Sequence, residues 1–102
     1  MKDIKHYING QYVGSASGKL FDNVNPANGK VISKVHEAGR DEVDAAVKAA
    51  KAALRGPWGK MTLEERTGIL HKVADGINAR FDEFLEAECL DTGKPKSLAR
   101  HI

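Results

Sequence analysis

One stretch in the C-terminal half of the sequence carries the clearest start and stop signals. Thr62 and Glu65 form a capping-box pattern, in which each side chain can accept a hydrogen bond from the backbone N–H of the other residue. Gly93 can take the left-handed conformation that ends a helix, and Pro95 cannot continue one. These signals predict one long helix over residues 62–90, on the order of 40 Å in length.

Apolar residues recur along this predicted helix at intervals of three and four, which places them on one face. They are Leu70, Val73, Ala74, Ile77, Phe81, Phe84 and Leu85. The remaining residues of the sequence do not obviously form enough apolar surface to cover a stripe of that length. We therefore expect it to pack against structure beyond these 102 residues.

Two β-hairpins are predicted within residues 5–36. The first turns at Asn9-Gly10, because a type I′ turn needs positive φ at both central residues. The second reverses between Asn25 and Gly29, where a proline fixes φ and the glycine supplies the reversal. Isolated hairpins are marginal in water, so these strands should pair with or pack on something further away.

A second helix is predicted over residues 40–55, where alanine is frequent and two acidic residues lie in the first turn. Its apolar face comprises Val43, Ala46, Val47, Ala50 and Leu54. A short connection, with Trp58 expected to bury its ring, should join it to the helix at 62–90 as an antiparallel pair. Residues 96–102 open a further helix without a stop signal, which indicates a fragment of a longer protein.

Composition excludes several classes of function. Sixteen Lys and Arg residues against fourteen Asp and Glu give a formal net charge of +2, so nucleic acid is not expected as a partner. The single cysteine excludes an internal disulfide and fits a reducing compartment, so we expect a cytoplasmic protein. The sequence shows neither a signal-peptide pattern nor an apolar run long enough for a membrane span.

The candidate chemical groups do not combine into an active site. Cys89 lies near the end of the long helix among acidic residues, which disfavour a thiolate, so we interpret it as a structural thiol. His71 and Asp75 are four residues apart and could share a metal, but no histidine pattern supports such a site, and a surface pair is the simpler interpretation. No G-x-G-x-x-G fingerprint for a dinucleotide is present.

Several motifs in a fixed order carry a family resemblance. They are Ile8-Asn9-Gly10, Asn25-Pro26 with Gly29, the helix segment EAGRDEVDAAVKAAKAAL, and Asp91-Thr92-Gly93-Lys94-Pro95. Over nearly all of its length the chain resembles the N-terminal part of the NAD(P)-dependent aldehyde dehydrogenase superfamily. The segments VHEAGR and AECLDTGKPKSLA are similar to the branch that oxidises 2-hydroxymuconic semialdehyde, a product of aromatic-ring cleavage.

The resemblance implies an α/β fold with a coenzyme-binding domain built on a modified doubly wound sheet, a catalytic domain and an oligomerisation domain. Residues 1–102 would form the N-terminal part of the coenzyme-binding domain. The full-length enzyme would be a homodimer or homotetramer that oxidises a small aldehyde to an acid. In the family a cysteine attacks the aldehyde, NAD accepts hydride, and a glutamate activates the water that releases the acid. The residues with these roles, and those that contact the coenzyme, would lie beyond residue 102.

One family site falls within the chain. Many members hold a monovalent cation, K⁺ or Na⁺, with residues just before the Asn-Pro dipeptide and with the aspartate of the D-T-G-K-P motif. By resemblance these are Asn23, Val24 and Asp91. Backbone carbonyl and carboxylate oxygens suit a hard cation. An equally simple role for Asp91 is to cap or salt-bridge the helix end.

A contrasting hypothesis is a complete, non-catalytic interaction module held together by the helix pair. The unfinished helix at residues 96–102 disfavours it. As part of an aldehyde dehydrogenase, the isolated chain should be inactive and loosely packed, because its apolar faces would lack their partners.

Overall fold

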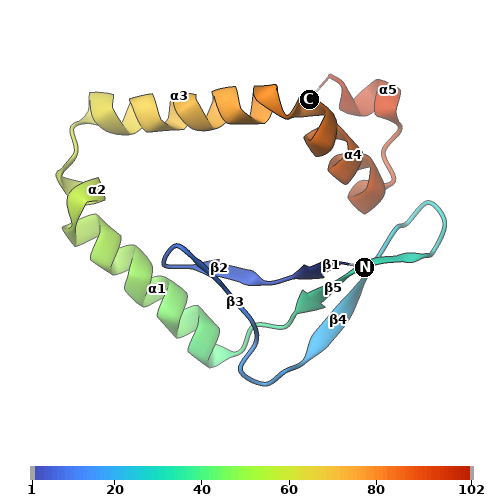
Figure 1. Ribbon diagram of the computed structural model, residues 1–102, viewed down its shortest axis with the longest axis horizontal. Coiled ribbons are helices and arrows are strands. Elements are labelled where there is room, and N and C mark those ends of the chain that lie inside the picture. Colours follow the sequence, from blue (N-terminus) through green and yellow to red (C-terminus); the bar gives the residue numbers. More distant parts are fainter. Residues whose placement is uncertain (1, 102) are drawn as a thin grey trace. The chain divides into compact units, whose positions relative to one another are not determined.

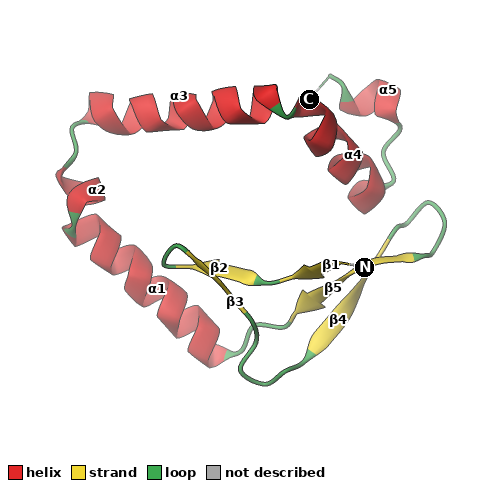
Figure 2. Ribbon diagram, viewed as in Figure 1, coloured by secondary structure: helices red, strands yellow, loops and turns green. Residues whose placement is uncertain are grey.

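The computed structural model describes residues 2–101, in which five strands precede five helices (Figures 1 and 2). The strands are β1 (Lys2–Ile4), β2 (His6–Ile8), β3 (Gln11–Val13), β4 (Leu20–Val24) and β5 (Val31–His36). The helices are α1 (Arg40–Arg55), α2 (Pro57–Lys60), α3 (Leu63–Ala79), α4 (Phe81–Thr92) and α5 (Lys96–Ala99). They fall into two units. The first contains the residues up to Asn23 and Ser33–Met61, and the second contains Val24–Ile32 and the residues from Thr62 onward.

The first predicted hairpin is confirmed. Strands β2 and β3 pair antiparallel, with Tyr7 opposite Tyr12. Asn9 and Gly10 have φ values of 53° and 78°, as a type I′ turn requires. The two tyrosine rings meet edge to face at a centroid distance of 5.0 Å, which adds a favourable cross-strand contact.

The second predicted hairpin, formed by β4 and β5, is confirmed and gains a third strand. The strand order is β1-β5-β4, and β1 runs parallel to β5 with Ile4 opposite Val35. The pattern had not predicted β1, because three residues at the start of the chain are too few to show a period. Its pairing fits the expectation that the hairpin strands need a partner further away in the sequence.

Helix α1 has the predicted bounds, and most of its predicted apolar face is exposed. Val43, Val47 and Leu54 are 54%, 47% and 68% exposed. The half-buried side chains are those of Ala46 and Ala49, on the part of α1 that contacts β2 and its turn. Small side chains let the helix approach the hairpin closely, so the valines remain on an open face.

The single long helix predicted over residues 62–90 is wrong, since the structure has two helices there. Helix α3 ends at Ala79 and α4 begins at Phe81, because Arg80 has φ −118° and ψ 31°. Neither glycine nor proline marks this break. The predicted start is confirmed: the Thr62 N–H donates to Glu65 at 3.0 Å, and the Glu65 N–H donates to the Thr62 hydroxyl at 3.1 Å.

Most of the predicted apolar stripe is exposed. Among residues 2–101, the buried apolar side chains are Leu85 and Ala99. On α3, by contrast, Leu70 and Val73 are more than half exposed. The structure therefore bears out the expectation that this stripe exceeds the partner surface of the chain.

Three smaller predictions have mixed outcomes. Trp58 is 38% exposed on α2, so its ring is not buried as predicted. Helix α5 is one turn long and ends at Ala99, whereas the sequence predicted helix to residue 102, which lies outside the described residues. Helices α1 and α3 belong to different units, so their antiparallel packing stays a prediction. In residues 2–101, none of the helices combines the length and apolar character that crossing a bilayer requires.

Candidate functional site

The end of β4 leads into a tightly bonded turn. Asn25 is buried, and its side-chain Oδ1 accepts a hydrogen bond of 2.9 Å from the Ala27 N–H. Its backbone N–H donates to the Lys30 carbonyl at 2.9 Å, and its own carbonyl accepts from the Gly29 N–H at 2.8 Å. These bonds fix the backbone directly after Val24, one of the predicted cation ligands.

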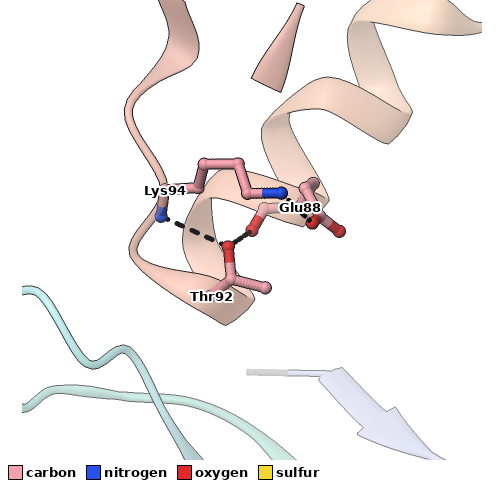
Figure 3. Close-up of polar contacts among 3 residues, drawn as sticks. All are labelled: Glu88, Thr92 and Lys94. Carbon is pink, nitrogen blue, oxygen red and sulfur yellow. Dashed lines mark hydrogen bonds and ion pairs between the residues drawn. The ribbon is translucent and has the colours of Figure 1, made fainter. Parts of the chain in front are cut away.

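The C-terminal end of α4 is held by a second set of polar contacts (Figure 3). The Thr92 hydroxyl donates to the Glu88 carbonyl at 2.7 Å and accepts from the Lys94 N–H at 3.2 Å. The Lys94 ammonium lies 3.2 Å from the Glu88 carboxylate. Gly93 has φ 74°, the left-handed conformation predicted for it, and its N–H donates to the Cys89 carbonyl at 3.0 Å.

These two segments of the second unit meet at Gly93 and Pro26. A Cβ atom added to Gly93 would lie 3.1 Å from Pro26 Cγ and 3.7 Å from the Ala27 nitrogen. Val24 and Asp91 are each two residues from this contact in the sequence. The structure thus brings together the segments that carry two of the three predicted ligands.

Asn23, the third predicted ligand, is half-buried in β4 and belongs to the first unit. It is bonded through its peptide to Val24, which is exposed at the last position of the strand. Asp91 is exposed in the last turn of α4.

The electrostatics of the α4 terminus favour a cation. A helix C-terminus carries partial negative charge from its last carbonyl groups, and Asp91 adds a carboxylate there. Carbonyl and carboxylate oxygens are the donors that alkali and alkaline-earth cations prefer. The residues present therefore fit a monovalent cation in the chemistry of their donors.

The other candidate groups are not among the predicted cation ligands. Cys89 is half-buried in α4, and His71 and Asp75 are exposed on α3. In the part of the chain that the structure describes, no group of three or more His, Cys, Asp or Glu residues is arranged to hold a metal ion.

The sequence did not predict the hydrogen bonds of two polar side chains, Glu42 and Thr92. Glu42, noted only as a first-turn acid, is buried and bonds two backbone N–H groups. Its position three residues after Gly39 is the spacing of a capping glutamate and could have revealed part of this role. The contacts of Thr92 had no such signal, because a threonine at a helix end has many alternative partners.

Comparison with known proteins identifies the family. The model of the aldehyde dehydrogenase family matches residues 12–101. The chain belongs to the aldehyde dehydrogenase family. Both the family and the α/β fold class expected from the sequence motifs are thereby confirmed.

Curated aldehyde dehydrogenases resemble the chain over its whole length. It is 78% identical to 2-hydroxymuconic semialdehyde dehydrogenase of Pseudomonas sp. (strain CF600), covering all of the chain and 21% of that protein. It is 45% identical to 2-aminomuconic 6-semialdehyde dehydrogenase of Pseudomonas sp, covering 20% of that protein. The chain thus spans about a fifth of the length of the curated relatives it matches.

Solved aldehyde dehydrogenases share its structure. The NAD⁺ complex of the Bacillus cereus enzyme superposes with a TM-score of 0.90 at 44% identity, over 95% of this chain and 20% of that one. The NAD-dependent enzyme of Sinorhizobium meliloti gives a TM-score of 0.91 at 40% identity, over 97% and 20%.

Proposed function

We propose that this chain is part of an NAD-dependent dehydrogenase that oxidises 2-hydroxymuconic semialdehyde to the corresponding carboxylic acid. The observation that supports this substrate is the difference in identity between two relatives. The chain is 78% identical to an enzyme named for 2-hydroxymuconic semialdehyde and 45% identical to one named for the 2-aminomuconic compound.

The reaction converts an aldehyde, water and NAD⁺ into a carboxylic acid, NADH and protons. NAD supplies the hydride acceptor when it is bound, and an enzyme cysteine forms the covalent bond to the aldehyde carbon. We assign neither role to residues of this chain, because the acidic residues around Cys89 in α4 disfavour the thiolate that a nucleophilic cysteine needs. The isolated chain is therefore expected to be inactive.

The experiment is a substrate and coenzyme comparison on the full-length enzyme. We expect kcat/KM to be highest for 2-hydroxymuconic semialdehyde with NAD, lower for the 2-aminomuconic compound, and lowest for a simple aliphatic aldehyde. A higher kcat/KM for the aliphatic aldehyde would refute the substrate assignment, and a preference for NADP would refute the coenzyme assignment. A full-length product of only about 100 residues without dehydrogenase activity would favour the interaction module instead.

We also propose that the carbonyls of Asn23 and Val24 and the carboxylate of Asp91 bind K⁺ or Na⁺. Support comes from the donor chemistry, from the contact between Gly93 and Pro26, and from the negative end of α4. In this role the ion is structural, since it would join the end of β4 to the end of α4.

The cation proposal is tested by the melting temperature of the full-length enzyme in chloride salts of K⁺, Na⁺ and a bulky organic cation at constant ionic strength. A saturable rise in melting temperature with K⁺ or Na⁺ that Asp91→Asn abolishes is the expected result. If the enzyme and its Asp91→Asn and Asp91→Ala variants respond equally to these salts, the proposal fails.

The whole enzyme is further proposed to be a cytoplasmic homodimer or homotetramer that acts on a small aldehyde and needs neither nucleic acid nor a membrane. Sedimentation of the full-length enzyme tests the assembly: a monomer at micromolar concentration would contradict it.

A further inference from the structure

At the last turn of α4, one side-chain hydroxyl adds two hydrogen bonds to the Gly93 cap. Thr92 Oγ1 donates to the carbonyl of Glu88, one turn earlier, and accepts from the N–H of Lys94, two residues later (Figure 3). The hydroxyl therefore links the end of the helix to the extended segment that follows it. The Glu88 carbonyl is also the regular helical acceptor for the Thr92 N–H, whereas the Lys94 N–H follows the helix and has this hydroxyl as its acceptor.

A second contact joins the same two positions through their side chains. The Lys94 ammonium and the Glu88 carboxylate are 3.2 Å apart, and both side chains are partly shielded from solvent. This pair alone cannot fix the turn, because partly exposed ion pairs between flexible side chains contribute little. The Thr92 hydroxyl instead bonds directly to two backbone groups, at 2.7 and 3.2 Å, and these directional bonds constrain the local backbone.

Asp91 directly precedes this hydroxyl, and its position depends on the same turn. Gly93 touches the ring of Pro26, so the last turn of α4 approaches the turn after β4 with almost no space to spare. A small rotation of the last turn would change the distance between the Asp91 carboxylate and the Val24 carbonyl. A cation site depends on that distance, because affinity follows the spacing and rigidity of the oxygen ligands.

We propose that Thr92 is a positioning residue for the proposed cation site: its hydroxyl holds the last turn of α4 and thereby the orientation of the Asp91 carboxylate. The inference rests on the proposed cation site and assigns no direct contact between Thr92 and the ion. Groups that orient a metal ligand are worth a factor of about ten or more in affinity. Removing the hydroxyl should therefore weaken cation binding by about tenfold.

The test measures the K⁺ concentration that gives half of the maximal rise in melting temperature, with the full-length enzyme at constant ionic strength. Thr92→Val replaces the hydroxyl with a methyl group of similar shape, and Thr92→Ser keeps the hydroxyl. We expect the half-maximal K⁺ concentration to rise about tenfold in Thr92→Val and to stay at the wild-type value in Thr92→Ser. If Thr92→Val does not fold, Thr92→Ala is titrated instead, with the same expectation.

The outcomes separate this inference from the cation proposal. If Asp91→Asn abolishes the K⁺ response while Thr92→Val lowers only the starting melting temperature, Thr92 is merely a helix-end stabiliser and the inference is overturned. If Asp91→Asn keeps the wild-type response, or the wild-type enzyme has none, the cation site itself is wrong and the inference falls with it. A tenfold shift in Thr92→Val that Thr92→Ser does not show supports both.

Discussion

The side-chain carboxylate of Glu42 accepts a hydrogen bond of 2.6 Å from the backbone N–H of Ala16, 26 residues earlier in the chain. The same carboxylate accepts from the Gly39 N–H at 3.2 Å. Glu42 therefore ties the first turn of α1 to the loop between β3 and β4. The buried carboxylate satisfies donors that would otherwise lack a partner, so it fixes where the helix begins relative to the strands.

Stability should depend on pH through this group. The N–H of Ala16 above all, followed by that of Glu42 itself, lowers the pKa of Glu42 below its usual 4.5, although burial acts in the opposite direction. A lowered folded-state pKa means that the carboxylate stabilises the fold fully above about pH 4.5. That contribution is lost as the pH falls through the lowered value.

Glu42→Gln should therefore melt at a lower temperature than the wild-type full-length enzyme at pH 7, and the difference should shrink below pH 4.5. Glu64→Gln is the matched control, since Glu64 also lies in the first turn of a helix but is exposed. An equal effect of the two substitutions at pH 7 would show that the Ala16 contact contributes nothing specific.

His36 should act as a hydrogen-bond acceptor for the same loop. Its Nδ1 accepts from the Ser15 N–H at 3.1 Å, so the proton of the neutral ring lies on Nε2. The Ser15 hydroxyl in turn donates to the Glu37 carbonyl. His36→Leu would leave the partly buried Ser15 N–H unsatisfied, at a cost of about 1–3 kcal/mol.

Hydrogen exchange of the peptide containing Ser15, in the full-length enzyme, measures this local cost. A loss of about 1.4 kcal/mol corresponds to tenfold faster exchange, which we expect for His36→Leu. His36→Asn is the control, because its side-chain oxygen can replace Nδ1 as the acceptor, and it should retain much of the protection. Equal exchange in the two variants would argue that the Ser15 bond is not what holds the loop.

Local chemistry made some elements predictable. The Asn9-Gly10 turn and the Thr62–Glu65 capping box are each decided by a few adjacent residues, because backbone φ and orphan N–H groups leave few alternatives. The left-handed conformation of Gly93 was likewise predictable from the adjacent residues. For the proposed cation site, the family motifs indicated the chemistry of the ligands, whereas the closeness of Gly93 to Pro26 depends on the three-dimensional fold.

The features that were missed depend on tertiary context. The helix breaks at Arg80 although the apolar residues keep their helical spacing across this position. The exposed ion pair of Arg80 with Glu83, at 2.8 Å, gives no signal of the break, because a continuous helix could form it too. The predicted apolar face of α1 contains both Ala46 and Val47, but only Ala46 is half-buried, because close approach to β2 favours the smaller residue. Periodicity shows which apolar residues share a face of a helix, but not which of them become buried against another element.

Gly59 should tolerate no side chain. A Cβ atom there would lie 1.5 Å from the carbonyl oxygen of Leu54 and 2.5 Å from its carbonyl carbon, so α2 would have to move away from the end of α1. Gly59→Ala should lower the melting temperature of the full-length enzyme, although alanine is the better helix former. Gly68→Ala, in α3 with open space around it, should instead stabilise by about 1 kcal/mol. A stabilising Gly59→Ala would contradict the close packing of α2 on α1.

Gly93 combines two constraints that a pair of substitutions can separate. Gly93 and Gly29 have almost the same positive φ, 74° and 72°, so alanine at either position should cost about 1–2 kcal/mol in backbone strain. Only at Gly93 would the new Cβ also press on Pro26, at 3.1 Å from Cγ, whereas Gly29 has open space. Gly93→Ala should therefore lower the melting temperature of the full-length enzyme more than Gly29→Ala does.

Pro26→Ala should relieve part of the difference between the two glycine variants, because it removes the ring atom that the new Cβ meets. In a double-mutant cycle, Gly93→Ala should thus be less harmful in the Pro26→Ala background than in the wild-type enzyme. Additive effects would mean that the ring shifts without cost. In that case backbone strain alone would make glycine necessary at the end of α4, and the contact with the turn after β4 would not constrain position 93.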